Sequence, residues 1–230
     1  MNNDVKLTLV VPCYNEKDNL NKIIRKCETI TSNHPIKFIL VDNGSTDGSH
    51  EIFNKLNNNK IKIHFIKKNV GYGHGILEGL KLSKSQFVGW THADLQTDIE
   101  DVILSLKFIK KDENIFIKGL RKGRGFSDNV LTFLMSVLET IIFQTVLWDI
   151  NSQPTIFNKK LLVLSSNPPH NFMLDLFFYV NAKKFKFKIK RFKVNFYKRQ
   201  FGQSKWNYNF KNKFITIVQA ITYSINLRIK

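Results

Sequence analysis

The sequence predicts an α/β protein whose central sheet is mostly parallel and carries helices on both faces. Short apolar runs of strand length alternate with segments of helical periodicity through the first half of the chain, which is the pattern of successive β-α units. The runs are rich in Val, Ile, Leu and Phe, as in strands that are buried on both faces. Polar clusters at 13–16, 42–46 and 92–96 each follow such a run, and open α/β sheets bind ligands at that edge.

The first half is expected to contain four β-α steps and a fifth strand. Apolar runs ended by turn residues predict strands at 7–11, 38–41, 61–66, 87–91 and 115–117. Apolar residues spaced three and four apart predict helices over 20–30, 52–56 and 76–82. Thr97, with Glu100 three residues later, has the pattern of a capping box and predicts the start of a further helix. The glycines of 71–75 indicate turn geometry more than phosphate binding.

The second half contains three less regular segments. Residues 130–148 are nearly all apolar apart from a narrow polar stripe at i+4 spacing, formed by Thr132, Ser136, Thr140 and Gln144. A helix with so wide an apolar face either packs into the protein or lies in a membrane interface. Between 185 and 196, apolar residues alternate with lysines in two opposite phases, which predicts one bulged strand or two strands. We expect one domain over 1–208 and an amphipathic helical tail over 209–230.

The chain is strongly basic. Its 230 residues suit one domain with a small appendage, and its formal net charge of +18 implies an anionic partner such as nucleic acid, a membrane surface or a phosphorylated substrate. Cys13 and Cys27 lack metal-type spacing and are interpreted as free thiols of a reducing compartment. The polar first residues predict no signal peptide, and no uncharged apolar run reaches the roughly 20 residues that span a membrane. We therefore expect a soluble or peripheral protein on the cytoplasmic side.

The polar cluster that follows the fourth strand has the residue types of a cation site. Asp94 and Gln96 are expected on a short loop between the strand at 87–91 and the next helix. A carboxylate and an amide oxygen two residues apart can both reach one hard cation such as Mg²⁺, which takes oxygen ligands and keeps waters and substrate phosphates. A polar loop that only caps the helix is the alternative interpretation.

Three ordered motifs resemble those of glycosyltransferase family 2. They are Val10-Val11-Pro12-Cys13-Tyr14-Asn15-Glu16, Val41-Asp42-Asn43-Gly44-Ser45-Thr46-Asp47 and His92-Ala93-Asp94-Leu95-Gln96. Within the family, the chain is most similar to the dolichol- or polyprenyl-phosphate sugar synthases, over roughly residues 5–205. The resemblance implies the nucleotide-sugar-binding GT-A fold and an inverting transfer of a sugar from a nucleoside-diphosphate sugar to a lipid phosphate.

The resemblance also assigns a donor site. In that family the first motif and the leading aspartate of the second hold the nucleotide base and ribose, here Pro12, Tyr14, Glu16 and Asp42. The third motif contacts the nucleotide sugar, here through His92, Ala93 and Asp94. It also binds the divalent cation, Mg²⁺ or Mn²⁺, that bridges the donor diphosphate, which implies Asp94 and Gln96 as metal ligands.

Two positions depart from the pattern of the family. His92 stands where the third motif has its first aspartate, and Asn43 where the second motif has its second. A site with one carboxylate fewer holds Mg²⁺ less strongly, and an imidazole is a softer ligand that tolerates Mn²⁺ better. We expect an active enzyme in which His92 is not a metal ligand. There are two alternatives. In one, His92 only hydrogen-bonds the ribose or diphosphate, and in the other, the site has lost its activity.

The acceptor side is expected in the second half of the chain. Gly119-x-Arg121 resembles the Gly-Ser-Arg that precedes the acceptor site of the lipid-phosphate synthases, and Arg124 follows closely. Because arginine binds phosphate oxygens in pairs, we expect Arg121 and Arg124 to bind the acceptor phosphate. Asp149 matches an aspartate-led motif that lines the catalytic cleft of the family.

A last motif precedes the helical tail. Arg199-Gln200-Phe201-Gly202-Gln203-Ser204-Lys205 resembles the Arg-x-x-Gly-x-Ser-Lys of the lipid-phosphate synthases. The resemblance implies that Arg199 offsets the charge of the leaving diphosphate, assisted by Ser204 and Lys205. The expected partners are therefore a nucleoside-diphosphate sugar, a lipid phosphate and the anionic surface of the inner face of the membrane, and not nucleic acid.

Two acceptors and two other classes of protein stay open. A polyprenyl phosphate is already ionised and needs no general base, whereas a sugar hydroxyl would need Asp149 or Asp175 to take its proton. A nucleic-acid-binding protein could use the aromatic residues interleaved with cations at 183–199. Strict alternation, however, places those aromatic residues on the face opposite the lysines. The other of these two classes is an inactive relative that only docks on anionic membrane.

Overall fold

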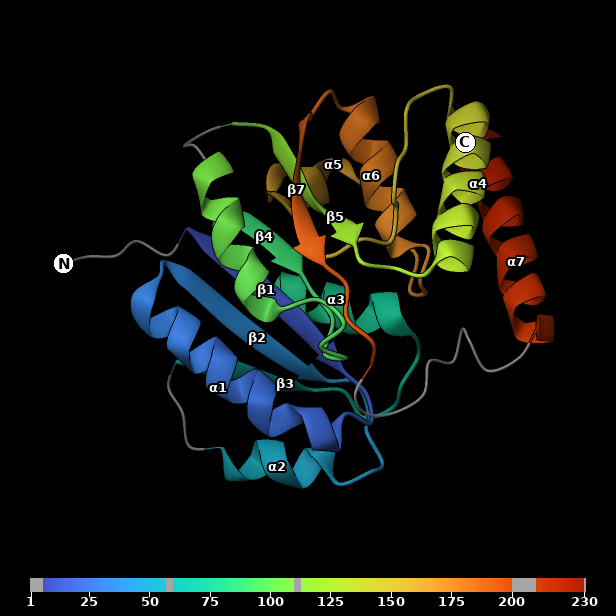
Figure 1. Ribbon diagram of the computed structural model, residues 1–230. Coiled ribbons are helices and arrows are strands. Elements are labelled where there is room, and N and C mark those ends of the chain that lie inside the picture. Colours follow the sequence, from blue (N-terminus) through green and yellow to red (C-terminus); the bar gives the residue numbers. More distant parts are fainter. Residues whose placement is uncertain (1–5, 57–59, 110–112, 200–209, 230) are drawn as a thin grey trace.

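Seven strands form one mixed sheet, most of which is parallel (Figure 1). The computed structural model describes residues 6–56, 60–109, 113–199 and 210–229. The strands are β1 (Leu7–Cys13), β2 (Ile36–Asp42), β3 (Ile61–Phe65), β4 (Phe87–Trp90), β5 (Ile115–Lys122), β6 (Thr155–Asn158) and β7 (Lys188–Asn195). Their order is β3-β2-β1-β4-β6-β5-β7. β6 is antiparallel to both of its neighbours, and the other pairs are parallel.

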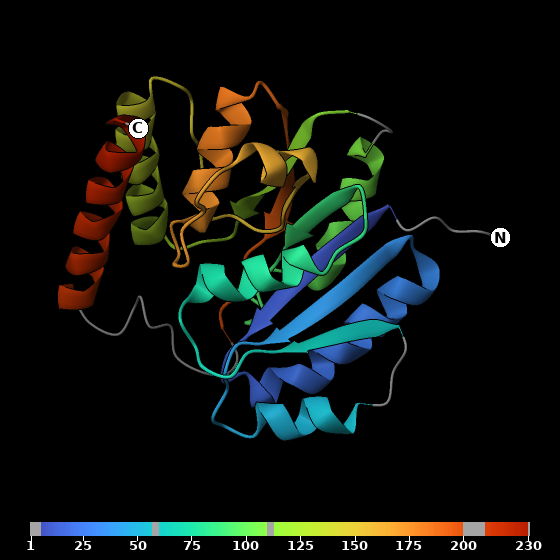
Figure 2. The same cartoon turned by 180° about the vertical axis from the view of Figure 1, so that it is seen from behind.

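Helices cover both faces of the sheet (Figures 1 and 2). One face carries α1 (Lys17–Asn33), α2 (Ser49–Lys55) and the 3₁₀ helix η1 (Ile99–Phe108). The other carries α3 (Tyr72–Lys81), α5 (Lys160–Leu164) and α6 (Leu174–Lys184). These two layers confirm the predicted α/β fold with a mostly parallel sheet.

The central strand shows why the sheet is buried on both sides. Leu9 and Val11 of β1 point into the core beneath α1 and η1, and Val10 points into the core beneath α3. The hydroxyl of Thr8, a polar side chain on this strand, is bonded to Ser85 at 2.7 Å. Every side chain of a central parallel strand must therefore be apolar or paired, which accounts for the unbroken apolar runs in the sequence.

The start of η1 differs from its prediction. Asp98, one residue after Thr97, is the N-cap, and its carboxylate accepts the backbone N–H of Glu100 at 3.0 Å. The Glu100 carboxylate pairs with Lys26 of α1 at 2.7 Å. The predicted capping box is wrong because Asp98, and not Thr97, takes the N-cap position.

The two-phase alternation near residue 190 has a different origin from a bulge. α6 continues to Lys184, Lys186 takes a left-handed φ of 57°, and β7 begins at Lys188. β7 then pairs with β5 in unbroken register. The phase change therefore marks the junction of a helix and a single strand. Phe187 and Phe192 are buried in the core, so these aromatic rings are not available to stack on bases.

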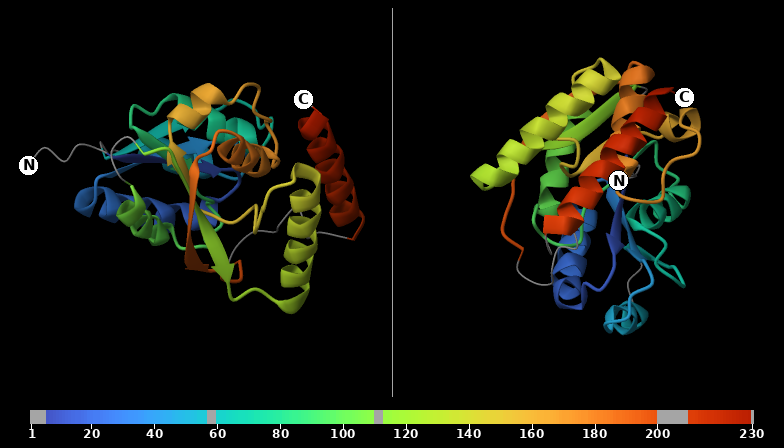
Figure 3. Two further views of the ribbon diagram at one scale, coloured as in Figure 1. Left: turned by 90° about the horizontal axis from the view of Figure 1, so that it is seen from above. Right: turned by 90° about the vertical axis from the view of Figure 1, so that its right-hand side faces the viewer.

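α4 (Phe126–Phe143) and α7 (Phe210–Ile229) lie side by side at one end of the molecule (Figure 3). The polar stripe of α4 faces the protein: Ser136 accepts the backbone N–H of Asp149, Thr140 that of Leu147, and Gln144 accepts from Arg228. Most apolar side chains before the last turn point away from the body, and Phe126 and Ile141 are 85% and 69% exposed, whereas Phe143 is buried in the core. α4 is thus a helix with its polar side inward and its apolar side outward.

Within the described part of the chain, α4 is the one helix that is long and apolar enough to cross a membrane by length and composition. A core helix of a soluble protein passes the same test, but only 17% of this window is buried. α7 adds further exposed apolar side chains, Phe214, Val218 and Ile225. The apolar face of the amphipathic tail is therefore mostly exposed, and α7 packs on α4 through Ala220 and Ser224.

Replacing Glu139 by Gln is expected to remove a pH-dependent loss of stability. The side chain is buried between α4 and α7, where Oε1 accepts a hydrogen bond from Ser224 at 2.8 Å. Burial raises its pKa from 4.5 to about 7. The folded protein therefore holds this proton more tightly than the unfolded chain, so its stabilising contribution is complete below the ordinary pKa and is lost as pH rises through about 7.

Thermal unfolding should show Glu139→Gln melting above the parent chain at about pH 8 and near it at about pH 5. Glu51→Gln, at an exposed position of α2, is the control and should leave the Tm unchanged at both pH values. An equal Tm for the two chains across this range would contradict the prediction.

Candidate active site

Three loops meet at the carboxyl edge of β1, β2 and β4. β1 and β2 end in register, with Cys13 opposite Asp42. The backbone N–H of Asn15 donates to the Ser45 hydroxyl at 3.1 Å, and the Asn15 side-chain oxygen accepts from the backbone of Thr46 at 2.8 Å. Asn15 itself has a φ of 55°, which turns the chain sharply at the end of β1. The predicted convergence of the first two polar clusters is confirmed.

Asp42 is the organising side chain of the second loop. It is 1% exposed, accepts the Ser45 backbone N–H at 3.0 Å on one oxygen and contacts His50 Nδ1 at 2.9 Å with the other. Pro12 and Tyr14, on the neighbouring loop, are both partly exposed. The two neighbouring loops therefore carry a buried carboxylate whose oxygens both have partners and a partly exposed tyrosine; their role in binding a base and ribose stays a prediction.

Asp94 lies on the third loop, between β4 and η1. Leu95 has a φ of 55°, and the backbone N–H of Gln96 donates to Asp94 Oδ1 at 3.1 Å. Burial alone would raise the pKa of Asp94, but His92, the Gln96 amide and the charge of Arg199 together lower it below its ordinary value. Asp94 is thus a stable carboxylate at a half-open edge. Ala93 beside it is buried.

Arg199 joins the first loop to the third. Its guanidinium pairs with Glu16 Oε1 at 2.7 Å, and its charge also acts on Asp94. The backbone of Tyr197, two residues earlier, exchanges hydrogen bonds with Gln96, whose carbonyl accepts the Tyr197 N–H at 2.7 Å. The sequence-predicted residues Glu16, Asp94, Gln96 and Arg199 are therefore brought together from three parts of the chain. Ser204 and Lys205 lie outside the described residues.

The residues at Asp94 fit a divalent cation that also binds phosphate. In the described part of the chain, no three His, Cys, Asp or Glu side chains gather as a closed metal site. Asp94 supplies one carboxylate, and His92 Nδ1 lies 3.8 Å from its Oδ2. A small number of protein ligands is the usual arrangement for Mg²⁺ or Mn²⁺ that takes its other ligands from substrate phosphates and water.

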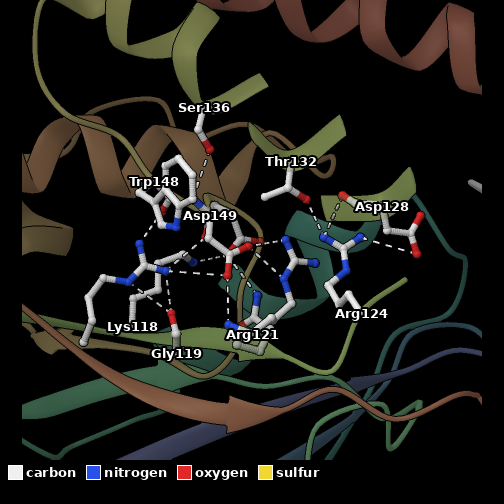
Figure 4. A network of polar contacts seen from close by, with 12 residues as sticks. Lys118, Gly119, Arg121, Arg124, Asp128, Thr132, Ser136, Trp148 and Asp149 are labelled. Carbon is white, nitrogen blue, oxygen red and sulfur yellow. Dashed lines mark hydrogen bonds and ion pairs between the residues drawn. The ribbon is translucent and has the colours of Figure 1, made fainter. Parts of the chain in front are cut away.

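A second cluster lies around the end of β5 (Figure 4). The Asp149 carboxylate accepts the side chain of Arg121, at 2.8 Å to Nε, and the backbone N–H of Arg121 at 3.0 Å. Burial would raise the pKa of Asp149, but Arg121 and Arg191 lower it. Arg191 also binds the carbonyls of Gly119 and Asp149. These are the contacts of a residue that positions Arg121; a direct role of Asp149 in catalysis stays a prediction.

Arg124 lies beside Arg121, turned toward Thr132 and Asp128 (Figure 4). Both guanidinium groups stack on Phe196, 5.6 and 5.3 Å from the ring centre. Burial and the charge of Arg121 lower the pKa of Arg124, and its Nε has no partner among the described residues. The cluster therefore has more positive charge than its one buried carboxylate neutralises.

A pocket of about 360 Å³ opens above these two arginines. Apart from the arginines, Asp149 and two polar residues of α4, its lining is apolar: Leu120, Phe126, Val130, Phe133 and Trp148. Phe126 and Phe133 belong to the exposed face of α4. The pocket thus has a cationic floor and an apolar wall that continues onto the surface.

Sequence reasoning missed a buried polar network between the two clusters. Lys118, 0% exposed, pairs with Asp175 at 2.9 Å, and Tyr72 connects Asp175 to His92. Burial lowers the pKa of Lys118, and Asp175 opposes that shift. A lysine that continues the apolar run 115–117 was the available signal, because a charge inside a sheet needs a buried partner. Tyr72 stands in the glycine run that was assigned to turn geometry.

The architecture has close counterparts among solved structures. Glucosyl-3-phosphoglycerate synthase from Mycobacterium tuberculosis, solved with Mn²⁺, UDP and phosphoglyceric acid, superposes with a TM-score of 0.70 over 97% of this chain and 78% of that one, at 12% identity. The mannosyltransferase PcManGT from Pyrobaculum calidifontis, with GDP-mannose and Mn²⁺, gives 0.67 over 96% and 64%, at 15% identity. The fold is therefore the GT-A fold, the class to which these proteins belong.

Sequence comparison identifies the family of the chain. The family model for glycosyl transferase family 2 matches residues 8–180, and the chain belongs to this family. An undecaprenyl-phosphate 4-deoxy-4-formamido-L-arabinose transferase of Aeromonas hydrophila is 30% identical over 44% of this chain and 33% of its own length. A dodecaprenyl-phosphate galacturonate synthase of Rhizobium johnstonii is 25% identical over 52% and 37%. The matches thus span about a third of the curated relatives.

Proposed function

We propose that the protein transfers a sugar from a nucleoside diphosphate to a polyprenyl phosphate at a membrane surface. The observation that carries this proposal is that the two carboxylates that could serve as a general base are both paired with cationic side chains. Asp149 is bound by Arg121 and lies near Arg191, and Asp175 is bound by the buried Lys118. A hydroxyl acceptor needs a carboxylate free to take its proton, whereas a phosphate acceptor is already ionised.

Arg121 and Arg124 are the groups that would bind this phosphate. Their guanidinium groups share the Phe196 ring and leave the pocket floor positive. Planar guanidinium groups bind phosphate oxygens in pairs. The apolar wall of the same pocket leads along α4, so a chain attached to the phosphate would lie against Phe126 and Phe133. An amphiphilic acceptor with an anionic head fits both parts, and the names of the sequence relatives support a polyprenyl phosphate.

The membrane contact is supported by the inverted polarity of α4. Its polar side chains bind the protein and its apolar side chains face outward, beside the exposed apolar side chains of α7. Such a surface is costly in water and stable in the interface of a lipid bilayer. The net charge of +18 adds attraction to anionic lipids on the side of the membrane where the lipid phosphate is reached. We propose a peripheral association with the cytoplasmic face.

The donor is assigned to the three-loop edge. The base and ribose lie against Pro12, Tyr14 and Asp42, and the diphosphate lies near Asp94, Gln96 and Arg199. A bound divalent cation supplies charge neutralisation of the diphosphate there. The acceptor phosphate oxygen forms a bond to the anomeric carbon as the bond to the donor diphosphate breaks, which inverts the configuration. The electron pair leaves with the diphosphate, and Arg199 offsets its charge after exchanging Glu16 for phosphate oxygens.

The test is sugar transfer on vesicles. Purified protein is mixed with undecaprenyl phosphate in vesicles with or without anionic lipid, a radiolabelled UDP- or GDP-sugar and Mn²⁺, and the label extracted with lipid is counted. We expect label in the lipid fraction, more with anionic vesicles, and flotation of the protein with those vesicles. Label only on a free saccharide acceptor would replace the lipid phosphate by a sugar hydroxyl. Tight binding of single-stranded RNA at physiological salt, without transfer, would favour the nucleic-acid alternative.

A further inference from the structure

A buried chain of hydrogen bonds ends on the ring of His92. Lys118 donates to Asp175 Oδ1 at 2.9 Å, and the Tyr72 hydroxyl donates to Asp175 Oδ2 at 3.3 Å. The Tyr72 oxygen lies 3.0 Å from His92 Nε2. Lys118 and Asp175 are 0% and 2% exposed. The His92 ring also packs edge to face on Tyr72, with the centroids 5.4 Å apart.

The donors and acceptors of this chain have one consistent direction. The Lys118 ammonium only donates, and the ionised Asp175 only accepts. Gln153 also donates its amide to Asp175, at 2.9 Å. The single hydroxyl proton of Tyr72 is used on Asp175, so the Tyr72 oxygen accepts the proton of His92 Nε2. The other ring nitrogen, Nδ1, is left with a free lone pair in the neutral imidazole.

Nδ1 lies on the Asp94 side of the imidazole ring. His92 Nδ1 lies 3.8 Å from Asp94 Oδ2, which is too far for a direct hydrogen bond. In the neutral imidazole both atoms carry lone pairs, and a cation bound between them would be attracted to both. Two ligands that each lie about 2.1 Å from a shared ion are about 3 to 4 Å apart. The pair therefore has the spacing of two ligands of one metal ion.

We propose that His92 Nδ1 is a direct ligand of the divalent cation at Asp94, and that Tyr72, held by Asp175 and Lys118, is the positioning residue that fixes its tautomer. This inference rests on the proposed function, which places a cation at Asp94. It differs from the expectation that His92 is no metal ligand. A nitrogen ligand favours Mn²⁺ over Mg²⁺, so the substitution in the third motif changes the metal preference and preserves the site.

Pulsed electron paramagnetic resonance of bound Mn²⁺ tests the inference without a turnover assay. The protein is loaded with Mn²⁺ and UDP, or GDP if that nucleotide binds. The expected spectrum contains modulation from one directly bound imidazole nitrogen. The modulation should disappear in His92→Asp and persist in His170→Ala, which alters an exposed histidine. His92→Asp should also bind Mg²⁺ more tightly relative to Mn²⁺ than the parent chain does.

Tyr72→Phe separates the positioning role from a structural one. The ring contact with His92 is kept and the hydroxyl is lost, so we expect Mn²⁺ affinity to fall by about ten- to a hundredfold. Tyr223→Phe, on the distant α7, should leave affinity unchanged. Bound Mn²⁺ and nucleotide without nitrogen modulation would overturn this inference and leave the proposed function intact. No binding of Mn²⁺ with either nucleotide would overturn both.

Discussion

Replacing Asp94 by Asn is expected to abolish metal-dependent nucleotide binding and to reduce sugar transfer by about 10³-fold. Asp94 is the carboxylate at the junction of the three loops, and its pKa is lowered so that it stays ionised. An asparagine oxygen can still accept the Gln96 backbone N–H that shapes the loop. The variant therefore removes the charge and keeps the local fold, and the loss reports the interaction with the cation and diphosphate.

Calorimetric titration measures this effect directly. UDP, GDP and their common sugar conjugates are titrated into both chains with Mn²⁺, with Mg²⁺ and with EDTA. Asp18→Asn is the matched control, because Asp18 is an exposed acid of α1. The parent chain and the control should bind one nucleotide only when metal is present. Equal binding by Asp94→Asn, or binding that EDTA does not weaken, would place the donor elsewhere.

Replacing Arg121 by Ala is expected to reduce transfer to a polyprenyl phosphate by about 10²- to 10³-fold, with unchanged nucleotide binding. Arg121 is fixed on two sides, by the Asp149 carboxylate and by the Phe196 ring, and it lies on the floor of the apolar-walled pocket. A guanidinium that is already held in place loses little conformational entropy when it binds phosphate. Most of the loss should appear as a raised KM for the lipid.

The alanine variant leaves the buried Asp149 short of a partner, which destabilises a protein. Arg121→Lys is therefore measured beside it, because lysine keeps a charge near Asp149 but cannot bind two oxygens as a fork. We expect a folded variant, judged by circular dichroism, with about a tenfold loss. Arg25→Ala, exposed on α1, should behave as the parent. Normal kinetics of both Arg121→Lys and Arg121→Ala would show that Arg121 does not bind the acceptor.

Several features of the site followed from the sequence because they depend on local pattern. The apolar runs at 7–11, 38–41 and 87–91 predicted strands, and parallel strands end at one edge, so the loops at Asn15, Asp42 and Asp94 had to meet there. The contact between Asn15 and Thr46 confirms this reasoning. The structure also agrees with the interpretation of Cys13 and Cys27 as free thiols, and both are buried.

Other features are set by contacts between distant residues, for which the sequence has no periodic signal. β6 is four residues long and enters the sheet antiparallel between β4 and β5. Lys118 and Asp175 are 57 positions apart, and Arg199 and Glu16 are 183 apart. Such pairs form only after the sheet order brings the strand ends together.

The sequence by itself determined the α/β class, the three polar loops at one sheet edge and the membership of a sugar-transferase family, because strand periodicity and short motifs are local properties. Tertiary structure decided which side of α4 faces the protein, since the polar stripe found partners in Asp149, Leu147 and Arg228. It also decided that both candidate bases are bound by cations and that His92 Nδ1 lies 3.8 Å from the Asp94 carboxylate. These outcomes depend on charge and hydrogen-bond pairing across the core, which packing alone creates.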